Sequence, residues 1–82
     1  MSIPLYAFVR GDTLGLVVLA PETESVADLA KRLARAAAPR VTLEGQLRVV
    51  HRGRPVPSEL SLMEAGIKPL DRVDLMQERD LD

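Results

Sequence analysis

Histidine and cysteine are the side chains that most often carry catalysis or bind transition metals, and this sequence contains one histidine and no cysteine. His51 lies beside Arg52 at the end of an apolar stretch. Metal binding needs further ligands, and base catalysis needs a carboxylate that orients the ring; the residues next to His51 supply neither. We therefore expect no catalytic residue, no metal ligand and no cofactor-binding residue around it.

The remaining polar residues do not form a recognisable site either. The five glycines are scattered singly and build no phosphate-binding loop. Arg48, Arg52 and Arg54 form a basic edge that could contact an acidic partner surface, although a solvated rim is the simpler interpretation. The acidic residues are expected in turns or on solvated faces: Asp12, Glu22, Glu24, Asp28, Glu44, Glu59 and Glu64. The sequence predicts no active site, and the chain is not expected to be an enzyme by itself.

Composition argues against several classes of function. A net charge of −1 gives no general attraction to nucleic acid or to an anionic membrane. No apolar run approaches the roughly 20 residues of a membrane-spanning helix, and the N-terminus lacks a signal-peptide pattern. The absence of cysteine is compatible with the cytoplasm, where we expect the protein to act. Hydrophobic residues make up 46% of the chain and aromatic residues 2%, so the core must be aliphatic.

A single helix organises the elements that must position any functional surface. Residues 25–38 carry apolar side chains at i, i+3, i+4 and i+7, with charged residues on the other side. Ser25 is placed to cap the start of this helix. Pro39 ends it, because its ring removes a hydrogen-bond donor and disfavours helical geometry at Ala38. The narrow apolar stripe requires a sheet to pack against.

Four segments have the composition of β-strands: Ile3–Val9, Leu14–Ala20, Leu47–Arg52 and Arg72–Met76. A short turn joins the first two into an antiparallel hairpin. Residues 61–65 are expected to form one helical turn, and residues 77–82 a short polar tail. A helical connection makes the first and last strands parallel neighbours at the centre of the sheet. We predict one α+β domain over residues 1–82 with a ubiquitin-like β-grasp fold, in which a mixed sheet of four to five strands packs on one main helix.

The expected core takes residues from the helix, the later strands and the connecting turns: Val26, Leu29, Leu33, Val49, Val56, Leu62, Ile67, Val73 and Leu75.

The hairpin strands are apolar on both faces. A sheet with one solvent-exposed face normally alternates apolar and polar residues. Because one helix covers one face, three interpretations stay open: a bulge switches the faces, exposed apolar groups are tolerated, or another protein buries the second face. In the last case the interface is whichever pair the helix leaves uncovered, Tyr6 and Phe8 or Leu16 and Val18.

Residues 47–76, LRVVHRGRPVPSELSLMEAGIKPLDRVDLM, resemble the second half of a ubiquitin-like domain. The shared features are the strand, the basic turn with its glycine, the short helical turn and the alternating last strand. The resemblance implies a second candidate interface, Arg48, Val50 and Arg52, on the surface that such modules use for transient binding. Ubiquitin and the sulfur carriers end in Gly-Gly, whereas this sequence ends in Asp82, so we do not expect a conjugated modifier.

Nearly the whole chain is similar to the small non-catalytic subunit of toluene-monooxygenase-type diiron hydroxylases. The resemblance rests on Ile3-Pro4 before an apolar-aromatic strand, on Leu47-Arg48-Val49, and on Ala65–Pro69 followed by Asp74. It implies a structural subunit of a multicomponent aromatic or alkene monooxygenase that binds one or more large helical hydroxylase subunits. The diiron centre would lie in that partner, and this chain would bind no cofactor and no small-molecule substrate. The chain departs from those subunits at Ala36–Ala38, where they are longer and more polar.

The alternative is a free-standing ubiquitin-like interaction module of another bacterial assembly, such as a type VII secretion system. The doubly apolar hairpin favours the hydroxylase subunit, because permanent interfaces are more hydrophobic than transient ones.

Overall fold

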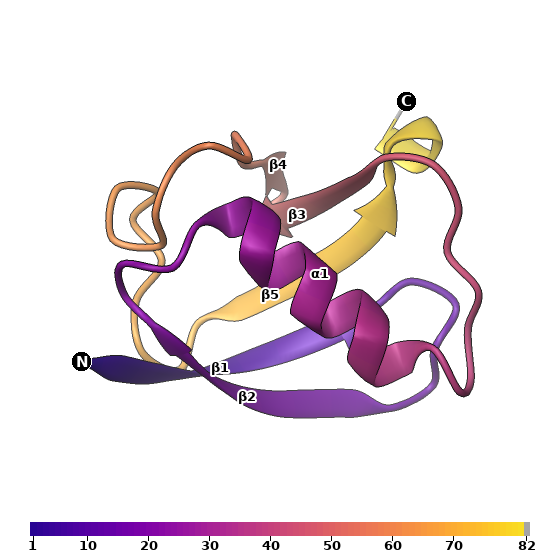
Figure 1. The fold of residues 1–82 in the computed structure, drawn as a ribbon, viewed down its shortest axis with the longest axis horizontal. Helices are drawn as coiled ribbons and strands as arrows, with labels where there is room; N and C mark the ends of the chain where they lie inside the picture. The colour runs from indigo at the N-terminus through magenta and orange to yellow at the C-terminus, as the bar shows by residue number, and fades with distance from the viewer. Residues whose placement is uncertain (82) are drawn as a thin grey trace.

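The structure is a computed structural model and describes residues 1–81. These residues form five strands, one α-helix and a short 3-10 helix: β1 (Ser2–Val9), β2 (Gly15–Pro21), α1 (Val26–Ala37), β3 (Leu47–His51), β4 (Arg54–Pro55), β5 (Arg72–Gln77) and η1 (Glu78–Leu81). The strands form one sheet in the order β2-β1-β5-β3-β4. The central pair, β1 and β5, is parallel, and the other pairs are antiparallel. Helix α1 lies across one face of the sheet (Figure 1), which confirms the expected β-grasp arrangement.

The helix has nearly the bounds that its sequence predicts. Ser25 is its N-cap, and the Oγ atom of Ser25 accepts a hydrogen bond from the backbone amide of Asp28 at 3.1 Å. Ala38, the residue before Pro39, is the C-cap. The inner side of α1 carries the buried apolar stripe: Val26, Leu29, Ala30, Leu33 and Ala37.

The core lies between α1 and the sheet, and all nine residues expected in it are buried. Strand β1 adds four more buried side chains from the face under the helix: Ile3, Leu5, Ala7 and Val9. No helix within residues 1–81 is both long enough and apolar enough to cross a membrane.

The C-terminal segment is more regular than the expected polar tail. Gln77 belongs to β5, and residues 78–81 form η1. The backbone amide of Glu78 donates to the carbonyl of Gln46 at 2.8 Å, and the Glu78 carboxylate pairs with Arg48 at 3.1 Å. These contacts hold the start of η1 beside the start of β3. Asp82, the last residue of the expected tail, lies outside the described residues.

Residues 61–65 form the expected single turn, in which the backbone amide of Ala65 donates to the carbonyl of Ser61 at 2.9 Å. The Ser61 hydroxyl accepts from the amide of Glu64 at 3.1 Å, and the Glu64 carboxylate accepts from the amide of Ser61 at 2.9 Å. Gly66 follows in the left-handed conformation, with φ of 77°.

Candidate partner-binding surface

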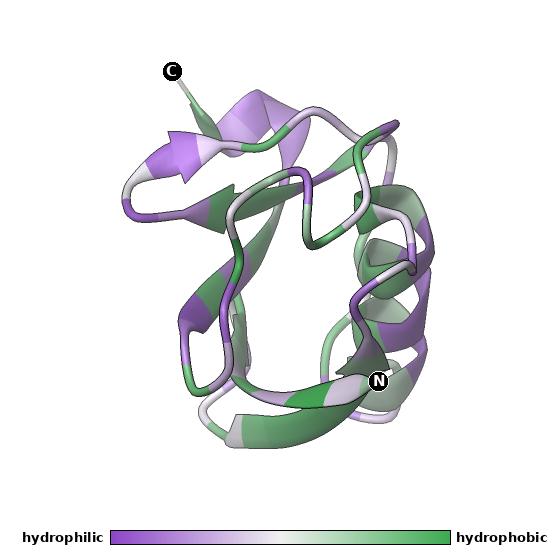
Figure 2. Ribbon diagram, turned by 90° about the vertical axis from the view of Figure 1, so that its left-hand side faces the viewer, coloured by the Kyte–Doolittle hydropathy of each residue, from purple (hydrophilic) through white to green (hydrophobic). Residues whose placement is uncertain are grey.

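The face of the hairpin that α1 leaves uncovered is apolar. The strand pairing runs one to one from Ser2–Pro21 to Phe8–Gly15, so no bulge switches the faces. The side chains turned away from the helix include Tyr6, Val17 and Leu19, whose exposed fractions are 46%, 70% and 62%. Figure 2 draws both hairpin strands mostly in the apolar colour. We call this surface the outer hairpin face and define it by five residues: Pro4, Tyr6, Phe8, Val17 and Leu19.

The strand register brings these side chains side by side. Tyr6 lies opposite Val17, and Pro4 lies opposite Leu19. The backbone amide of Tyr6 donates away from β2, to the carbonyl of Asp71 at 3.0 Å, so Tyr6 and Val17 form a non-hydrogen-bonded pair. Side chains approach most closely in such pairs. The outer hairpin face is therefore continuous across both strands.

Phe8 is fixed at one end of this face by its two neighbours. A Cβ atom at Gly15 would lie 2.7 Å from Cε1 of Phe8, so the ring occupies the space that only glycine leaves free. On the other side, the Arg72 guanidinium carbon lies 4.2 Å from the centre of the ring. Asp74 holds that guanidinium at 3.0 Å. The ring is 36% exposed, and these contacts hold its position without a partner.

Of the two pairs considered for the hairpin interface, one lies on the face that α1 covers. Leu16 and Val18 are half-buried and pack against the core beneath α1. Tyr6 and Phe8, the other pair, lie on the face that the helix leaves uncovered. Val17 and Leu19 lie on the same face and were not among the expected interface residues. The hydroxyl of Tyr6 was the available signal, since a tyrosine usually turns its polar end to water, and cross-strand pairing then carries Val17 to the same side.

The second expected surface, on β3, is not an open patch. Val50 is 8% exposed, because Pro55 on β4 and Asp74 on β5 flank it in the sheet. Arg48 is engaged by Glu78 and also donates to the carbonyl of Val56 at 3.4 Å. Val50 therefore offers little exposed area to a partner on this surface. Arg52 is exposed, at the turn between β3 and β4.

His51 has an orienting carboxylate, which comes from a residue distant in the sequence and not from its immediate neighbours. Its Nε2 atom lies 2.8 Å from Oδ2 of Asp71, and the same oxygen accepts from the backbone amide of Lys68 at 3.0 Å. The Lys68 amide and the His51 ring together lower the pKa of the Asp71 carboxyl, against the opposing effect of burial. Within residues 1–81, no three His, Cys, Asp or Glu side chains gather as they would around a metal ion. The pair ties the turn before β5 to the end of β3.

Asp12 is not the solvated carboxylate that its place in a turn suggested. Both of its oxygens accept from Nε of Arg40 at 3.0 Å, and its side chain is 1% exposed. The hydrogen bonds from Arg40 hold the pKa of Asp12 below its ordinary value, although burial opposes them. This contact joins the β1–β2 turn to the segment after α1.

The free edge of β2 is partly covered by the helix. Arg32 of α1 donates to the backbone carbonyl of Leu19 at 2.7 Å and pairs with Glu24 at 2.6 Å. The edge is therefore less available to an added strand. The outer hairpin face is the larger surface of the hairpin that no other element within residues 1–81 covers.

Comparisons with known proteins agree with this architecture. The model of the family described as Toluene-4-monooxygenase system protein B matches residues 2–76. A chain of the toluene 4 monooxygenase HD complex with the inhibitor 4-bromobenzoate superposes with a TM-score of 0.87 at 23% identity, covering 95% of this chain and 100% of that one. A comparison with curated protein sequences gave no match.

Ubiquitin-like proteins share the fold at lower sequence identity. Caldiarchaeum subterraneum ubiquitin superposes with a TM-score of 0.79 at 14% identity, covering 95% of each chain. The ubiquitin-like domain of Plasmodium falciparum Dsk2 superposes with a TM-score of 0.76 at 22% identity, covering 93% of this chain and 97% of that one.

Proposed function

The chain belongs to the family of toluene-4-monooxygenase system protein B, and on that premise we propose that it is a non-catalytic structural subunit of a multicomponent diiron hydroxylase acting on aromatic or alkene substrates. In this proposal it binds permanently to a large helical hydroxylase subunit. The diiron centre and the substrate site belong to that partner, and this chain supports the partner's fold.

The observation that carries the proposal is the outer hairpin face. Four bulky apolar side chains, Tyr6, Phe8, Val17 and Leu19, are between 36% and 70% exposed on one side of a two-stranded unit. Soluble monomers seldom leave such groups together in water unless the surface binds something. A permanent subunit interface is more hydrophobic than a transient one, and this face has that character.

Phe8 is suited to be an anchor of the interface. Aromatic residues dominate the binding energy of many interfaces, especially when they need little reordering on binding. Gly15 and Arg72 already hold the Phe8 ring in place, so docking costs little side-chain entropy there.

The proposal is tested by co-expressing the tagged chain with the large hydroxylase subunit of its own host. We expect the two to purify together in fixed stoichiometry and to stay together at high salt, because an apolar interface is not screened by ions. A chain that elutes alone as a monomer under these conditions would contradict the proposal and would favour the free-standing interaction module.

A further inference from the structure

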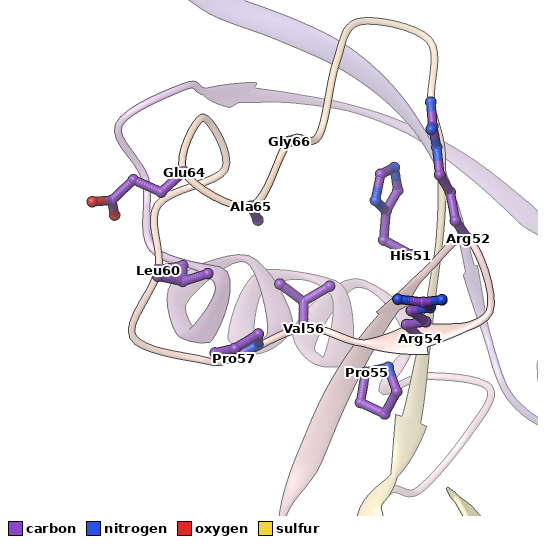
Figure 3. Close-up of a pocket in the computed structure, with 10 residues that line it drawn as sticks. All are labelled: His51, Arg52, Arg54, Pro55, Val56, Pro57, Leu60, Glu64, Ala65 and Gly66. Atoms are coloured by element: carbon purple, nitrogen blue, oxygen red, sulfur yellow. The ribbon is translucent and has the colours of Figure 1, made fainter.

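A hollow lies between the β3–β4 turn and the loop of residues 60–66, apart from the outer hairpin face (Figure 3). Its volume is about 600 Å³. Its lining is mostly apolar and comes from Pro55, Val56, Pro57, Leu60 and Ala65. Ala65 and Gly66 leave it open, because they contribute at most a methyl group where a larger residue would fill the space.

The charge on the rim of this hollow is positive. Arg52 and Arg54 line one end, and within residues 1–81 neither forms an ion pair. Asp71 lies near enough to Arg52 for their charges to interact, but its Oδ2 atom is already bonded to His51 and to the Lys68 amide. Two arginines are thus available to an external anion.

The one carboxylate on the opposite rim does not cancel them. Glu64 accepts from the amide of Ser61 at 2.9 Å, and Figure 3 shows its carboxylate turned away from the hollow.

Arg52 occupies a backbone conformation that other residues adopt more easily. Its φ is 55°, and Gly53 after it has φ of 78°. Two successive positive φ values in a two-residue hairpin turn favour Asn-Gly or Asp-Gly. A long side chain at the first position is strained, and non-glycine residues held in this region occur often at ligand-binding sites. Having an arginine at position 52 therefore lowers the stability of the β3–β4 turn.

From these observations we propose that the hollow binds an acidic segment of a protein partner. The segment places an apolar side chain against Val56, Leu60 and Ala65 and acidic side chains against Arg52 and Arg54, whose guanidinium groups point in different directions in Figure 3. The apolar lining favours a peptide over nucleic acid, whose backbone would leave these side chains uncovered, and the net charge of −1 gives no general attraction to polyanions. This binding site is independent of the proposed function and of the outer hairpin face.

The experiment is a selection of displayed random peptides on the immobilised full chain, followed by affinity measurements with the selected peptides. We expect the selected sequences to share Asp or Glu close to a bulky apolar residue. The double variant Arg52→Gln/Arg54→Gln should lower their affinity at least about tenfold, because charge-assisted hydrogen bonds are lost. The matched control Lys31→Gln/Arg35→Gln removes two positive charges from the exposed side of α1 and should leave the affinity unchanged.

Two further variants separate the hollow from surface charge. Ala65→Phe keeps both arginines but fills the space, and it should likewise lower the affinity at least about tenfold. Arg52→Asn should raise the melting temperature, since Asn tolerates the left-handed conformation, while peptide affinity falls. Val17→Asp, on the outer hairpin face, should bind the peptides like the unmodified chain, so failure of this site and failure of the hydroxylase interface are distinguishable.

The proposal is overturned if the selection yields no acidic consensus or if the Arg52→Gln/Arg54→Gln variant binds as the unmodified chain does. It is also overturned if inorganic phosphate or a single-stranded oligonucleotide displaces the peptides completely, which would mark a general anion site. Both glutamine substitutions are at exposed positions, so the test does not depend on whether Ala65→Phe folds.

Discussion

Replacing Val17 by Asp tests the outer hairpin face directly. Val17 is 70% exposed and lies opposite Tyr6, so the substitution removes little core packing from the isolated chain. The strand loses β-propensity and one cross-strand contact, each worth up to about 1 kcal/mol. The melting temperature should fall by no more than about 8–16 °C in a domain of this size, and the protein should still fold.

The effect on docking is larger. Burying a valine side chain contributes about 1.5–3 kcal/mol, and the 70% that is exposed in the free chain corresponds to about 1–2 kcal/mol of that amount. An aspartate in the same place must also lose its hydration without a partner, which costs at least a further 1–3 kcal/mol or so. A total of about 3 kcal/mol weakens binding about a hundredfold.

The measurement is titration calorimetry with the large hydroxylase subunit, supported by co-purification. Met63→Asp is the matched control, because Met63 is 60% exposed but lies on the turn beside the start of α1. It should bind within a few-fold of the unmodified chain. If Val17→Asp binds as tightly as Met63→Asp while remaining folded, the outer hairpin face is not the interface.

Three other substitutions test the fold and the positioning of Phe8. Leu33→Ala empties a fully buried site and should cost about 2–5 kcal/mol in urea unfolding, whereas a loss under about half a kcal/mol would mean that the site is not buried. Gly15→Ala puts a Cβ atom 2.7 Å from the Phe8 ring, so the ring should leave Arg72 and partner affinity should fall while the melting temperature changes little; unchanged affinity would show that the ring's position does not matter. Asp71→Asn removes a carboxyl whose pKa is lowered in the folded state. The stabilisation from the ionised carboxyl is therefore present above the unfolded-state pKa of about 3.9. It is lost as the pH falls through the folded-state pKa. The variant should be less stable than the unmodified chain at neutral pH, and the difference should shrink in acid; a difference that is constant with pH would contradict the contribution of this charge.

The elements with strong periodicity could be predicted from the sequence. The helix emerged from a clear apolar stripe between Ser25 and Pro39, and its burial followed from that stripe. Val73 and Leu75 alternate with charged residues, which fixed their inward direction on β5. These features depend on residues that are close together in the sequence, so the sequence pattern was sufficient to predict them.

The candidate site could be predicted only in part, because its features depend on residues distant in sequence. Both faces of the hairpin are apolar, so nothing within β2 decided whether Leu16 or Val17 would meet the helix. Val50 is covered by strands on both sides, and the carboxylate beside His51 comes from Asp71, on the loop before β5. Contacts between residues so far apart in the sequence can be predicted only when the order of the strands in the sheet is known.

The pairing of β1 with β5 has a consequence for how the protein is made. Strand β1 leaves the ribosome well before β5, its parallel neighbour at the centre of the sheet, because more than half of the chain lies between them in the sequence. The hairpin can form early, but β1 has an unpaired edge until β5 is synthesised, and such edges promote aggregation. Arg72, which stacks on Phe8, also arrives with β5. A partner that docks on Phe8 in its stacked position would therefore bind chains in which β5 has paired with β1 in preference to nascent chains that still lack β5.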